Sequence, residues 1–312
     1  MFLRLSRSGA YRRGVPNRSE VVRGSRRRWA VGLAFVIVGA IALTVEGRIG
    51  AAYPGSSTTY GATVVDYSLA SKLLGRRLTE VGIVPPGDER RPLLILLHGR
   101  HDSPRRSSLV PRESGPESML SDALFAGLSQ LGSRAPIVVL LNGGQHSWYH
   151  DRRTGRWSSM ILDEAIPDAV RRFHARADRM AIGGISMGGY GALHLAALRP
   201  HEFCAVGGHS AALYKSFGAS APVAFDNAAD FARNDVFKAA RQTRFNRLPV
   251  WIDVGVDDPF HDADAAFVSL LRARGVSVTY DVWPGAHTAS YWKAHMAAYL
   301  SFYASALAQC SS

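Results

Sequence analysis

Short apolar runs of strand length recur along the chain, separated by longer segments whose apolar residues have helical spacing. Runs without polar alternation are typical of strands covered on both faces, as in a parallel sheet. They lie at residues 91–99, 135–144, 178–186, 202–210, 248–255 and 276–285. Before them, GATVVDYSLASKLLGRRLTEVGIVPP (residues 61–86) alternates and ends at two prolines, which predicts a leading antiparallel hairpin.

The segments between these strands predict helices. They cover residues 118–131, 161–177, 187–198, 263–274 and 290–307. Alternating strands and helices indicate an α/β fold, with a mostly parallel central sheet, helices on both faces and right-handed crossovers. Ligands of such sheets bind beyond the carboxyl ends of the strands. Residues 211–247 contain no clear strand, and we expect them to form an excursion over that edge.

One strand-to-helix junction carries the sequence GISMG, residues 184–188. It fits Gly-x-Ser-x-Gly, the nucleophile elbow of α/β-hydrolases, in which a sharp turn exposes a serine hydroxyl. The pentapeptide alone is a weak signal, because glycine-rich chains contain such strings by chance. The strand before it and the helix after it make Ser186 the candidate nucleophile. The alternative is a strand-to-helix loop with no chemical role.

A serine nucleophile needs a general base, and in α/β-hydrolases the chain order is serine, acid, histidine. Three histidines come late enough in the chain, namely His261, His287 and His295. His287 stands between the last predicted strand and the final helix, whereas His295 falls inside that helix, so His287 is the predicted base. The acid should follow the penultimate strand, where Asp257 and Asp258 are equally well placed.

Two backbone N–H groups are predicted to stabilise the oxyanion of a tetrahedral intermediate. One belongs to Met187, the residue after the candidate nucleophile. The other is expected in the loop after the strand at 91–99, and we assign it to Arg100. Losing one such donor typically costs about 3–4 kcal/mol of transition-state stabilisation.

From about residue 60 to residue 305 the chain resembles the esterase branch of the α/β-hydrolases, which includes esterase D (S-formylglutathione hydrolase) and the secreted actinobacterial mycolyltransferases. Three segments carry the resemblance: GISMGGYGALHLAALRPHEFCAVGGHSAAL, DVGVDDPF and GAHTASYW. In the acid loop of esterase D the second of the paired aspartates is catalytic, and by that resemblance Asp258 is the acid here. WYHDRRTGRWSSMILDEAIP (residues 148–167) is similar to a mycolyltransferase segment, although those enzymes take a glutamate from another loop as their acid.

The N-terminus has the composition of an export signal. Residues 1–48 hold ten arginines and two glutamates, so they contribute +8 of the formal net charge of +12. The remaining +4 does not favour a nucleic-acid-binding surface. The uncharged apolar run at about residues 29–45 predicts a signal peptide or membrane anchor, with the chain after it outside the cytoplasm. We therefore expect an export or anchor segment at 1–52 and a catalytic domain at 53–312.

Aromatic residues near strand ends are candidates for a substrate pocket, with packing in the core as the alternative. They are Trp148, Tyr149, Tyr190 and, in the loop of the first two, Trp157. HGRHD (98–102) and HDAD (261–264) lack a third ligand at metal spacing, so neither a metal nor a cofactor is expected. Cys204 and Cys310 could form one bridge in an oxidising compartment, but Cys204 lies in an apolar run and is expected to be a small core residue.

These features predict an exported serine hydrolase that cleaves carboxylic esters of a small molecule or a glycolipid through Ser186, His287 and Asp258. Two alternatives remain open. An acyltransferase would use the same residues and pass the acyl group to a sugar hydroxyl instead of water. A non-catalytic envelope protein would keep the fold for binding, although all three catalytic positions are intact here. Membrane contact is expected through the N-terminal segment, and the oligomeric state is left open.

Overall fold

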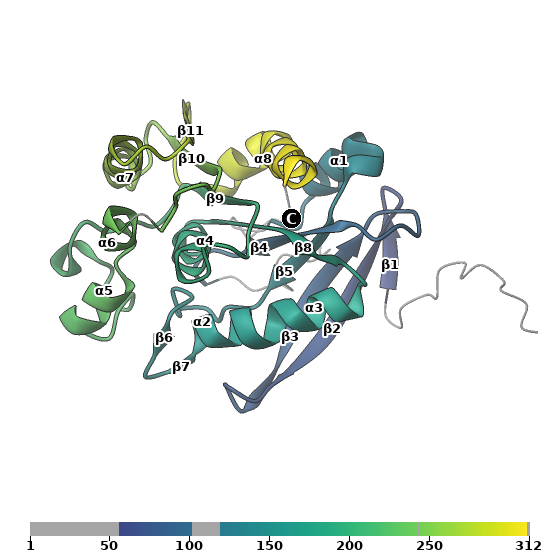
Figure 1. Cartoon of the computed structure of the whole chain (residues 1–312), viewed down its shortest axis with the longest axis horizontal. Coiled ribbons are helices and arrows are strands. Elements are labelled where there is room, and N and C mark those ends of the chain that lie inside the picture. The colour runs from purple at the N-terminus through teal and green to yellow at the C-terminus, as the bar shows by residue number, and fades with distance from the viewer. Residues whose placement is uncertain (1–55, 102–118, 243, 311–312) are drawn as a thin grey trace, which may run out of the picture. The chain divides into compact units, whose positions relative to one another are not determined.

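The central element is a twisted, mostly parallel sheet with helices on both faces (Figure 1). The structure, a computed structural model, describes residues 56–101, 119–242 and 244–310. The chain divides into two units, residues 1–48 and 49–312, and every described residue belongs to the second. The apolar run at 29–45, predicted to be a signal or anchor, lies outside the described residues. Within the described ranges, no helix has the length and hydropathy needed to cross a membrane.

In the described part of the chain the sheet has nine strands, in the order β1-β2-β3-β5-β4-β8-β9-β10-β11. The strands from β5 through β11 pair in parallel, whereas β1, β2 and β3 are antiparallel. Their bounds are β1 (Ser56–Thr59), β2 (Ala62–Ser71), β3 (Arg76–Val84), β4 (Pro92–Leu97), β5 (Ile137–Leu141), β8 (Arg176–Ile185), β9 (Ala205–His209), β10 (Val250–Gly255) and β11 (Val278–Trp283). The predicted leading hairpin is β2–β3, and each of the six apolar runs overlaps one strand, with β8 beginning two residues before its run. A separate two-stranded sheet pairs β6 (Asp151–Arg152) with β7 (Gly155–Arg156).

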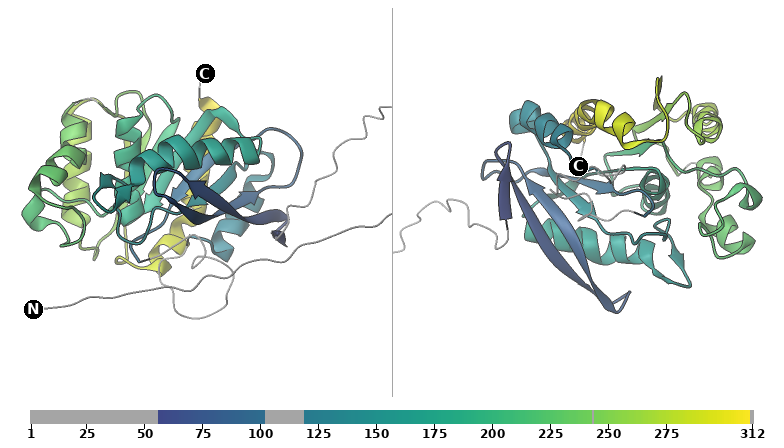
Figure 2. Two further views of the ribbon diagram at one scale, coloured as in Figure 1. Left: turned by 90° about the horizontal axis from the view of Figure 1, so that it is seen from below. Right: turned by 180° about the vertical axis from the view of Figure 1, so that it is seen from behind.

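The helices divide between the two faces of the sheet. On one face lie α1 (Asp122–Leu131), followed by η1 (Gly132–Arg134), and α8 (Ala289–Gln309). On the other lie α2 (Trp157–Met160), η2 (Ile161–Ala165), α3 (Ile166–Arg172), α4 (Met187–Leu198), α6 (Val236–Arg241) and α7 (His261–Ala273). Figure 2 shows the β1–β3 strands at the side of the sheet opposite to α5 (Ala228–Asn234), α6 and α7.

Both faces of the sheet are buried, and β4 shows how. Leu93, Ile95 and Leu97 point into the core shared with α4, whereas Leu94 and Leu96 point into the core shared with α1 and α8. All five are at most 2% exposed. Because side chains alternate along a strand, a strand covered on both sides reads as an unbroken apolar run, and burying each such side chain contributes roughly 1.5–3 kcal/mol.

Two details differ from the expectations, and a third, the excursion, agrees with them and gains helices. The helix predicted at 161–177 begins at Trp157 and ends at Arg172, because His174 takes a φ of 50° and turns the chain toward β8. The excursion at 211–247 is helical, with η3 (Phe217–Ala219), α5 (Ala228–Asn234) and α6. The short strands β1, β6 and β7 have no counterpart in the apolar pattern, since strands of two to four residues carry too few positions to show a period.

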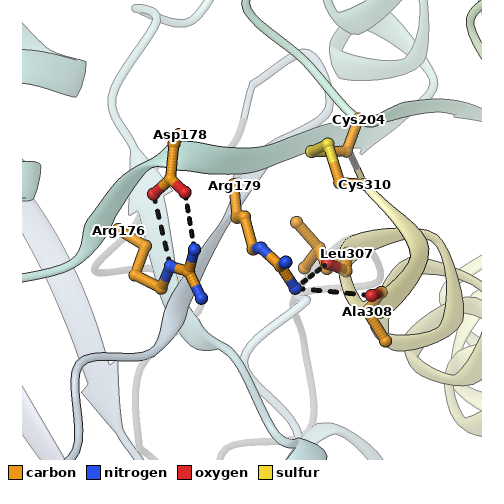
Figure 3. The surroundings of a disulfide bond; sticks show 7 residues. All are labelled: Arg176, Asp178, Arg179, Cys204, Leu307, Ala308 and Cys310. Atoms are coloured by element: carbon orange, nitrogen blue, oxygen red, sulfur yellow. Dashed lines mark hydrogen bonds and ion pairs between the residues drawn. A yellow bond between two sulfur atoms is a disulfide. The ribbon is translucent and has the colours of Figure 1, made fainter. Parts of the chain in front are cut away.

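The cysteines correct a further expectation. Cys204 is buried, as expected of a core residue, but its sulfur is bonded to that of Cys310, 106 residues later in the chain (Figure 3). The bond ties the residue before β9 to the end of α8. Beside it, Arg179 donates from Nη1 to the carbonyl oxygens of Leu307 and Ala308, 3.3 Å away in each case. Both the disulfide and these bonds hold the C-terminal end of α8 at the amino ends of β8 and β9.

Candidate active site

The elbow between β8 and α4 holds its serine in a conformation that few residues adopt. Ser186 has a φ of 53°, in the left-handed region that is uncommon outside glycine. Its N–H donates to the carbonyl oxygen of His209 (3.1 Å), and its own carbonyl accepts from the N–H groups of Tyr190 (3.1 Å) and Ala212 (2.9 Å). These bonds from three segments fix the turn and direct the hydroxyl away from the sheet.

The glycines of GISMG are explained by close backbone contacts. A Cβ on Gly188 would lie 2.0 Å from the carbonyl oxygen of Leu97, and one on Gly184 would lie 2.4 Å from the backbone of Gly188. Neither main-chain contact can be relieved by a side-chain rotation. Glycine at these positions lets the start of α4 approach the end of β4, which brings the elbow beside the loop that begins at His98.

Ser186, His287 and Asp258 form one hydrogen-bonded chain. His287 Nε2 lies 2.8 Å from Ser186 Oγ, and its Nδ1 lies 2.8 Å from Asp258 Oδ2. Because a carboxylate accepts only, Nδ1 carries the proton and Nε2 is free to accept from the serine hydroxyl. The Asp258 side chain is fully buried, whereas the His287 side chain is 19% exposed, so solvent reaches this hydrogen-bonded chain at the histidine.

The two adjacent aspartates have different environments. Asp258 follows β10 and is 5% exposed; its Oδ1 also accepts from the N–H of Phe260 at 2.8 Å. Asp257 is exposed, and its N–H donates to the carbonyl oxygen of Gly285 at 2.9 Å, in the loop that carries the histidine. The geometry therefore pairs Asp258 with His287 and leaves the side chain of Asp257 at the surface.

The other late histidines lie elsewhere. His295 stacks on Trp283 with ring centroids 3.8 Å apart, and burial lowers its pKa. His261, at the start of α7, faces Asp262 at 3.3 Å. Rings of Phe260 and Trp292, each 5.1 Å from His287, flank the imidazole that does reach the serine.

The loop after β4 carries the second predicted oxyanion donor. His98 donates from Nδ1 to the carbonyl oxygen of Gly99 (2.8 Å) and accepts at Nε2 from the N–H of Gly143 (3.2 Å). Burial lowers the pKa of His98 to about 4, which agrees with a neutral ring that accepts at Nε2. Arg100 follows, with its guanidinium over the ring of Trp148 at 6.0 Å. The two hydrogen bonds of His98 thus hold this loop beside the start of α4, so Arg100 follows a fixed segment close to Met187.

The predicted pocket aromatics are core residues. Trp148, Tyr149 and Tyr190 are at most 2% exposed. The Tyr149 ring fills a slot in which a Cβ on Gly143 would lie 2.0 Å from it, and the Tyr149 hydroxyl donates to the carbonyl of His98. The Tyr190 hydroxyl donates 2.6 Å to the carbonyl of Asn234. The packing alternative therefore describes these three residues, whereas Trp157 lines an open hollow.

A buried polar network below the elbow was not foreseen. Asp253 Oδ2 lies 2.6 Å from His209 Nδ1, and both side chains are fully buried. Tyrosine hydroxyls complete the network: Tyr291 and Tyr299 donate to Asp253 Oδ1, and Tyr303 lies 2.9 Å from His209 Nε2. Since His209 also accepts the N–H of Ser186, this network supports the strand against which the nucleophile turns. Its sequence signal is the single aspartate inside the apolar run of β10.

A second buried carboxyl lies near the catalytic acid candidate. Asp264 accepts from the N–H of Ala211 at 3.0 Å. Burial, and then the nearby charge of Asp258, raise the pKa of Asp264 well above its usual range. Within the described residues, no group of three or more histidine, cysteine or acidic side chains could hold a metal ion.

Comparison with known proteins decides the family. Residues 72–303 match the Esterase family, described as "Putative esterase". The chain belongs to that family. It is 26% identical over 197 residues to the esterase Rv1288 of Mycobacterium tuberculosis, which covers 55% of this chain but only 40% of that protein. It is 23% identical over 195 residues to the acetyl esterase of Caldicellulosiruptor saccharolyticus, covering 55% of this chain and 73% of that protein. The matched part of this Esterase family member thus spans less than half the length of the mycobacterial relative.

Solved structures agree with the fold. A ferulic acid esterase covers 80% of this chain with a TM-score of 0.67 and 22% identity, and all of its own chain is matched. An S-formylglutathione hydrolase from Agrobacterium tumefaciens covers 81% of this chain and is itself matched over 98%, with a TM-score of 0.66 and 18% identity. MPT51 of Mycobacterium tuberculosis covers 78% of this chain and is matched over 98%, with a TM-score of 0.60 and 18% identity. The fold of this Esterase family member is therefore that of the α/β-hydrolases.

Proposed function

We propose that this member of the Esterase family is an exported serine hydrolase that cleaves carboxylic esters. The observation that carries the proposal is the unbroken chain from Ser186 Oγ through His287 to Asp258, with 2.8 Å at each step. This is the geometry that nucleophilic catalysis by a serine requires, with a base in contact with the hydroxyl and a third group that orients the base.

The reaction follows from the hydrogen bonds. His287 Nε2 takes the proton of Ser186 Oγ as that oxygen attacks the ester carbonyl, and then gives the proton to the departing alcohol. Asp258 keeps the proton of His287 on Nδ1 and stabilises the imidazolium. Water, activated by the same histidine, then hydrolyses the acyl-enzyme. The N–H groups of Met187 and Arg100 are the proposed donors to the oxyanion of both tetrahedral intermediates.

Export is supported by two independent features. The first is the arginine-rich N-terminus with its apolar run at 29–45. The second is the bond between Cys204 and Cys310, because disulfides persist mainly in oxidising, extracytoplasmic compartments. We therefore place the catalytic domain outside the cytoplasmic membrane, secreted or anchored by its N-terminal segment. Protease added to intact spheroplasts should digest this domain, and complete protection would contradict export.

The nucleophile is tested with a single substitution. Ser186→Ala should reduce the hydrolysis of short aryl esters by roughly three orders of magnitude or more, with little change in melting temperature. Ser269→Ala, at an exposed serine on α7, is the matched control. A fluorophosphonate should label the wild type and the control at Ser186 by peptide mapping, but not the Ser186 variant.

The same assay separates the alternatives. A non-catalytic envelope protein would neither hydrolyse the ester nor react with the fluorophosphonate. An acyltransferase would form an acylated sugar when trehalose or another glycan is added, whereas the proposed hydrolase releases free acid in both conditions. Labelling at a serine other than Ser186 would contradict the assignment of the elbow.

A further inference from the structure

A hollow of about 820 Å³ is lined by none of the candidate catalytic residues and has no part in the chemistry described so far. Its walls come from the start of β3, the loop after β5, the β6–β7 hairpin and the first part of the excursion at 211–247. The β6–β7 hairpin and the β2–β3 hairpin can be located in Figure 1. Its volume is within the range of pockets that hold small molecules, about 300–1,000 Å³.

The hollow has a strong excess of positive charge. Arg76, Arg77, Arg152 and Arg153 line it, and Asp226 is the one acidic residue among its described walls. Asp226 is already engaged by two of them, because Arg152 Nη2 lies 2.8 Å from its Oδ1 and Arg153 Nε lies 3.6 Å from its Oδ2. Neither Arg76 nor Arg77 forms an ion pair with another described residue. Among the described side chains, the guanidinium of Arg76 thus has no counter-charge, and that of Arg77 has only the Ser68 hydroxyl, to which its Nη1 donates at 3.5 Å.

Apolar side chains form part of the wall, and one of them holds an arginine in place. The guanidinium of Arg76 lies over the Trp157 ring, 4.8 Å from its centroid, a cation–π arrangement that favours one position of the charge. Trp157 and Phe225 are 5% and 4% exposed, whereas Val223 at the rim is 45% exposed. A cationic group beside an apolar wall fits an organic anion, whose charged end meets arginine while its carbon skeleton contacts the rings.

One series of ring contacts connects the hollow to the candidate triad, and a second contact leads from it to the loop of the proposed oxyanion donor. Phe225 in its wall lies 6.4 Å from the ring of Tyr214, which lies 5.8 Å from Phe260, which in turn lies 5.1 Å from His287. On the other side, the rings of His146, a wall residue, and His101 are 4.4 Å apart, and His101 is next to the proposed oxyanion donor. The hollow is therefore at the same edge of the sheet as the site.

We propose that this hollow binds the anionic end of the ester substrate, so that the enzyme prefers esters with a carboxylate or phosphate several bonds from the scissile carbonyl. Arg76 and Arg77 contact the anion, and the linking chain lies along Phe225, Tyr214 and Phe260. This inference rests on the proposed esterase function, because it assigns the remote part of that substrate. The chemistry shared by carboxylate and phosphate is a compact anion, which guanidinium groups bind through paired hydrogen bonds.

The preference is tested with three para-nitrophenyl esters of equal chain length. One ends in a carboxylate (the monoester of octanedioic acid), one in a phosphate and one in a neutral methyl ester. We expect kcat/KM to be roughly tenfold higher for an anionic ester than for the neutral one, mainly through KM, as one or two charge-assisted contacts would give. Comparing the two anionic esters tells carboxylate from phosphate. Equal kcat/KM for all three would overturn the inference.

The location is tested by substitution. Arg77→Gln, and separately Arg76→Gln, should reduce the anionic-to-neutral ratio of kcat/KM toward one. Because the ratio is internal to each variant, a general loss of activity does not affect it. Arg134→Gln, at an exposed arginine in η1 that has no ion pair among the described residues, is the matched control and should keep the wild-type ratio. A ratio that survives the Arg76→Gln/Arg77→Gln double variant would show that the anion binds elsewhere.

Binding without catalysis separates this inference from the proposed function. Titration calorimetry of Ser186→Ala with octanedioate should show binding that weakens at least about fivefold in the Arg77→Gln background and with added salt, whereas octanediol should not bind. If the wild type hydrolyses para-nitrophenyl acetate but octanedioate does not bind, the inference is wrong and the esterase function stands. If octanedioate binds through Arg77 but no ester is hydrolysed, the hollow is an anion site and the esterase function is wrong.

Discussion

Removing the Cys204–Cys310 bond should lower the free energy of unfolding substantially and leave catalysis unchanged. The bond joins residues 106 positions apart in the sequence, and the strands β9, β10 and β11 lie between them along the chain. In the chain-entropy description, a crosslink that closes a loop of this length removes about 4–5 kcal/mol of unfolded-state entropy at room temperature. Measured effects are usually smaller, so we expect Cys204→Ala/Cys310→Ala to cost about 2–4 kcal/mol.

The folded state should tolerate the change, because other contacts hold the same helix end. Arg179 still donates to the carbonyl oxygens of Leu307 and Ala308, and the apolar face of α8 still packs on the sheet. Ser186 lies at the carboxyl end of β8, whereas the bond lies at the amino ends of β8 and β9. We therefore expect kcat and KM for a short aryl ester to stay within about twofold of the wild type.

Guanidinium denaturation of the oxidised wild type, the reduced wild type and the double variant measures the effect. The midpoint should fall in both samples that lack the bond, and the m-value should rise, since an uncrosslinked unfolded chain exposes more surface. A change in unfolding free energy below about 0.5 kcal/mol, with the bond verified by thiol titration, would refute the entropic reasoning. A large loss of activity in a folded double variant would refute the separation between bond and site.

Three further outcomes are expected. Asp258→Asn should lower kcat by about 10³–10⁴-fold with little effect on substrate binding, because the amide cannot hold the catalytic tautomer of His287. Asp257→Asn, at the surface, should change kcat little. Kinetics of the two variants in parallel compares them, and a large loss of kcat in the Asp257 variant would contradict the pairing of Asp258 with His287. Gly188→Ala should cost several kcal/mol or abolish folding, because its Cβ would meet a main-chain oxygen at 2.0 Å, whereas Gly218→Ala has open space and should be neutral in thermal melts. Burial raises the pKa of Glu80 from 4.5 to about 8, so between these two pH values the folded protein keeps a proton on Glu80 that the unfolded chain releases. Stability should therefore fall as pH rises from about 5 to about 8, by an amount on the order of 4 kcal/mol from this group, and Glu80→Gln should flatten that fall in denaturation curves; an unchanged slope would contradict it.

Most of the fold could be predicted from the sequence, because the spacing of apolar residues along the chain follows from which faces of the strands and helices are buried. Strands buried on both faces, such as β4, are visible as unbroken apolar runs, and the helices between them have regular spacing. The candidate nucleophile and base could also be predicted from the sequence, since GISMG and the loop at His287 mark the carboxyl ends of strands. Local sequence could not distinguish Asp257 from Asp258 as the acid. It depends on a hydrogen bond from the N–H of Asp257 to Gly285, which directs one side chain outward and the other toward the histidine.

Features that join distant segments were missed for a common physical reason. The disulfide depends on where α8 ends relative to β9, and no period in the sequence encodes that distance. The aromatic residues of the loop after β5 were ambiguous, because Trp148 and Tyr149 are turned inward by positive φ values that the residue types do not favour. The hollow combines arginines from the β2–β3 hairpin and from the β6–β7 hairpin, two segments whose proximity only the folded chain defines.

The position of β11 gives the three members of the candidate triad unequal local stability. Ser186 turns from β8, which has a strand on each side, whereas the loop of His287 leaves β11, the outermost strand, which pairs only with β10. The hydrogen bond between Asp257 and Gly285 joins the loops of acid and base, so both should separate from the serine in one opening event. Amide hydrogens of β11 should then exchange sooner than those of β8. The rate of ester hydrolysis should therefore fall at denaturant concentrations lower than those that unfold the whole sheet, because it requires β11 to stay paired with β10.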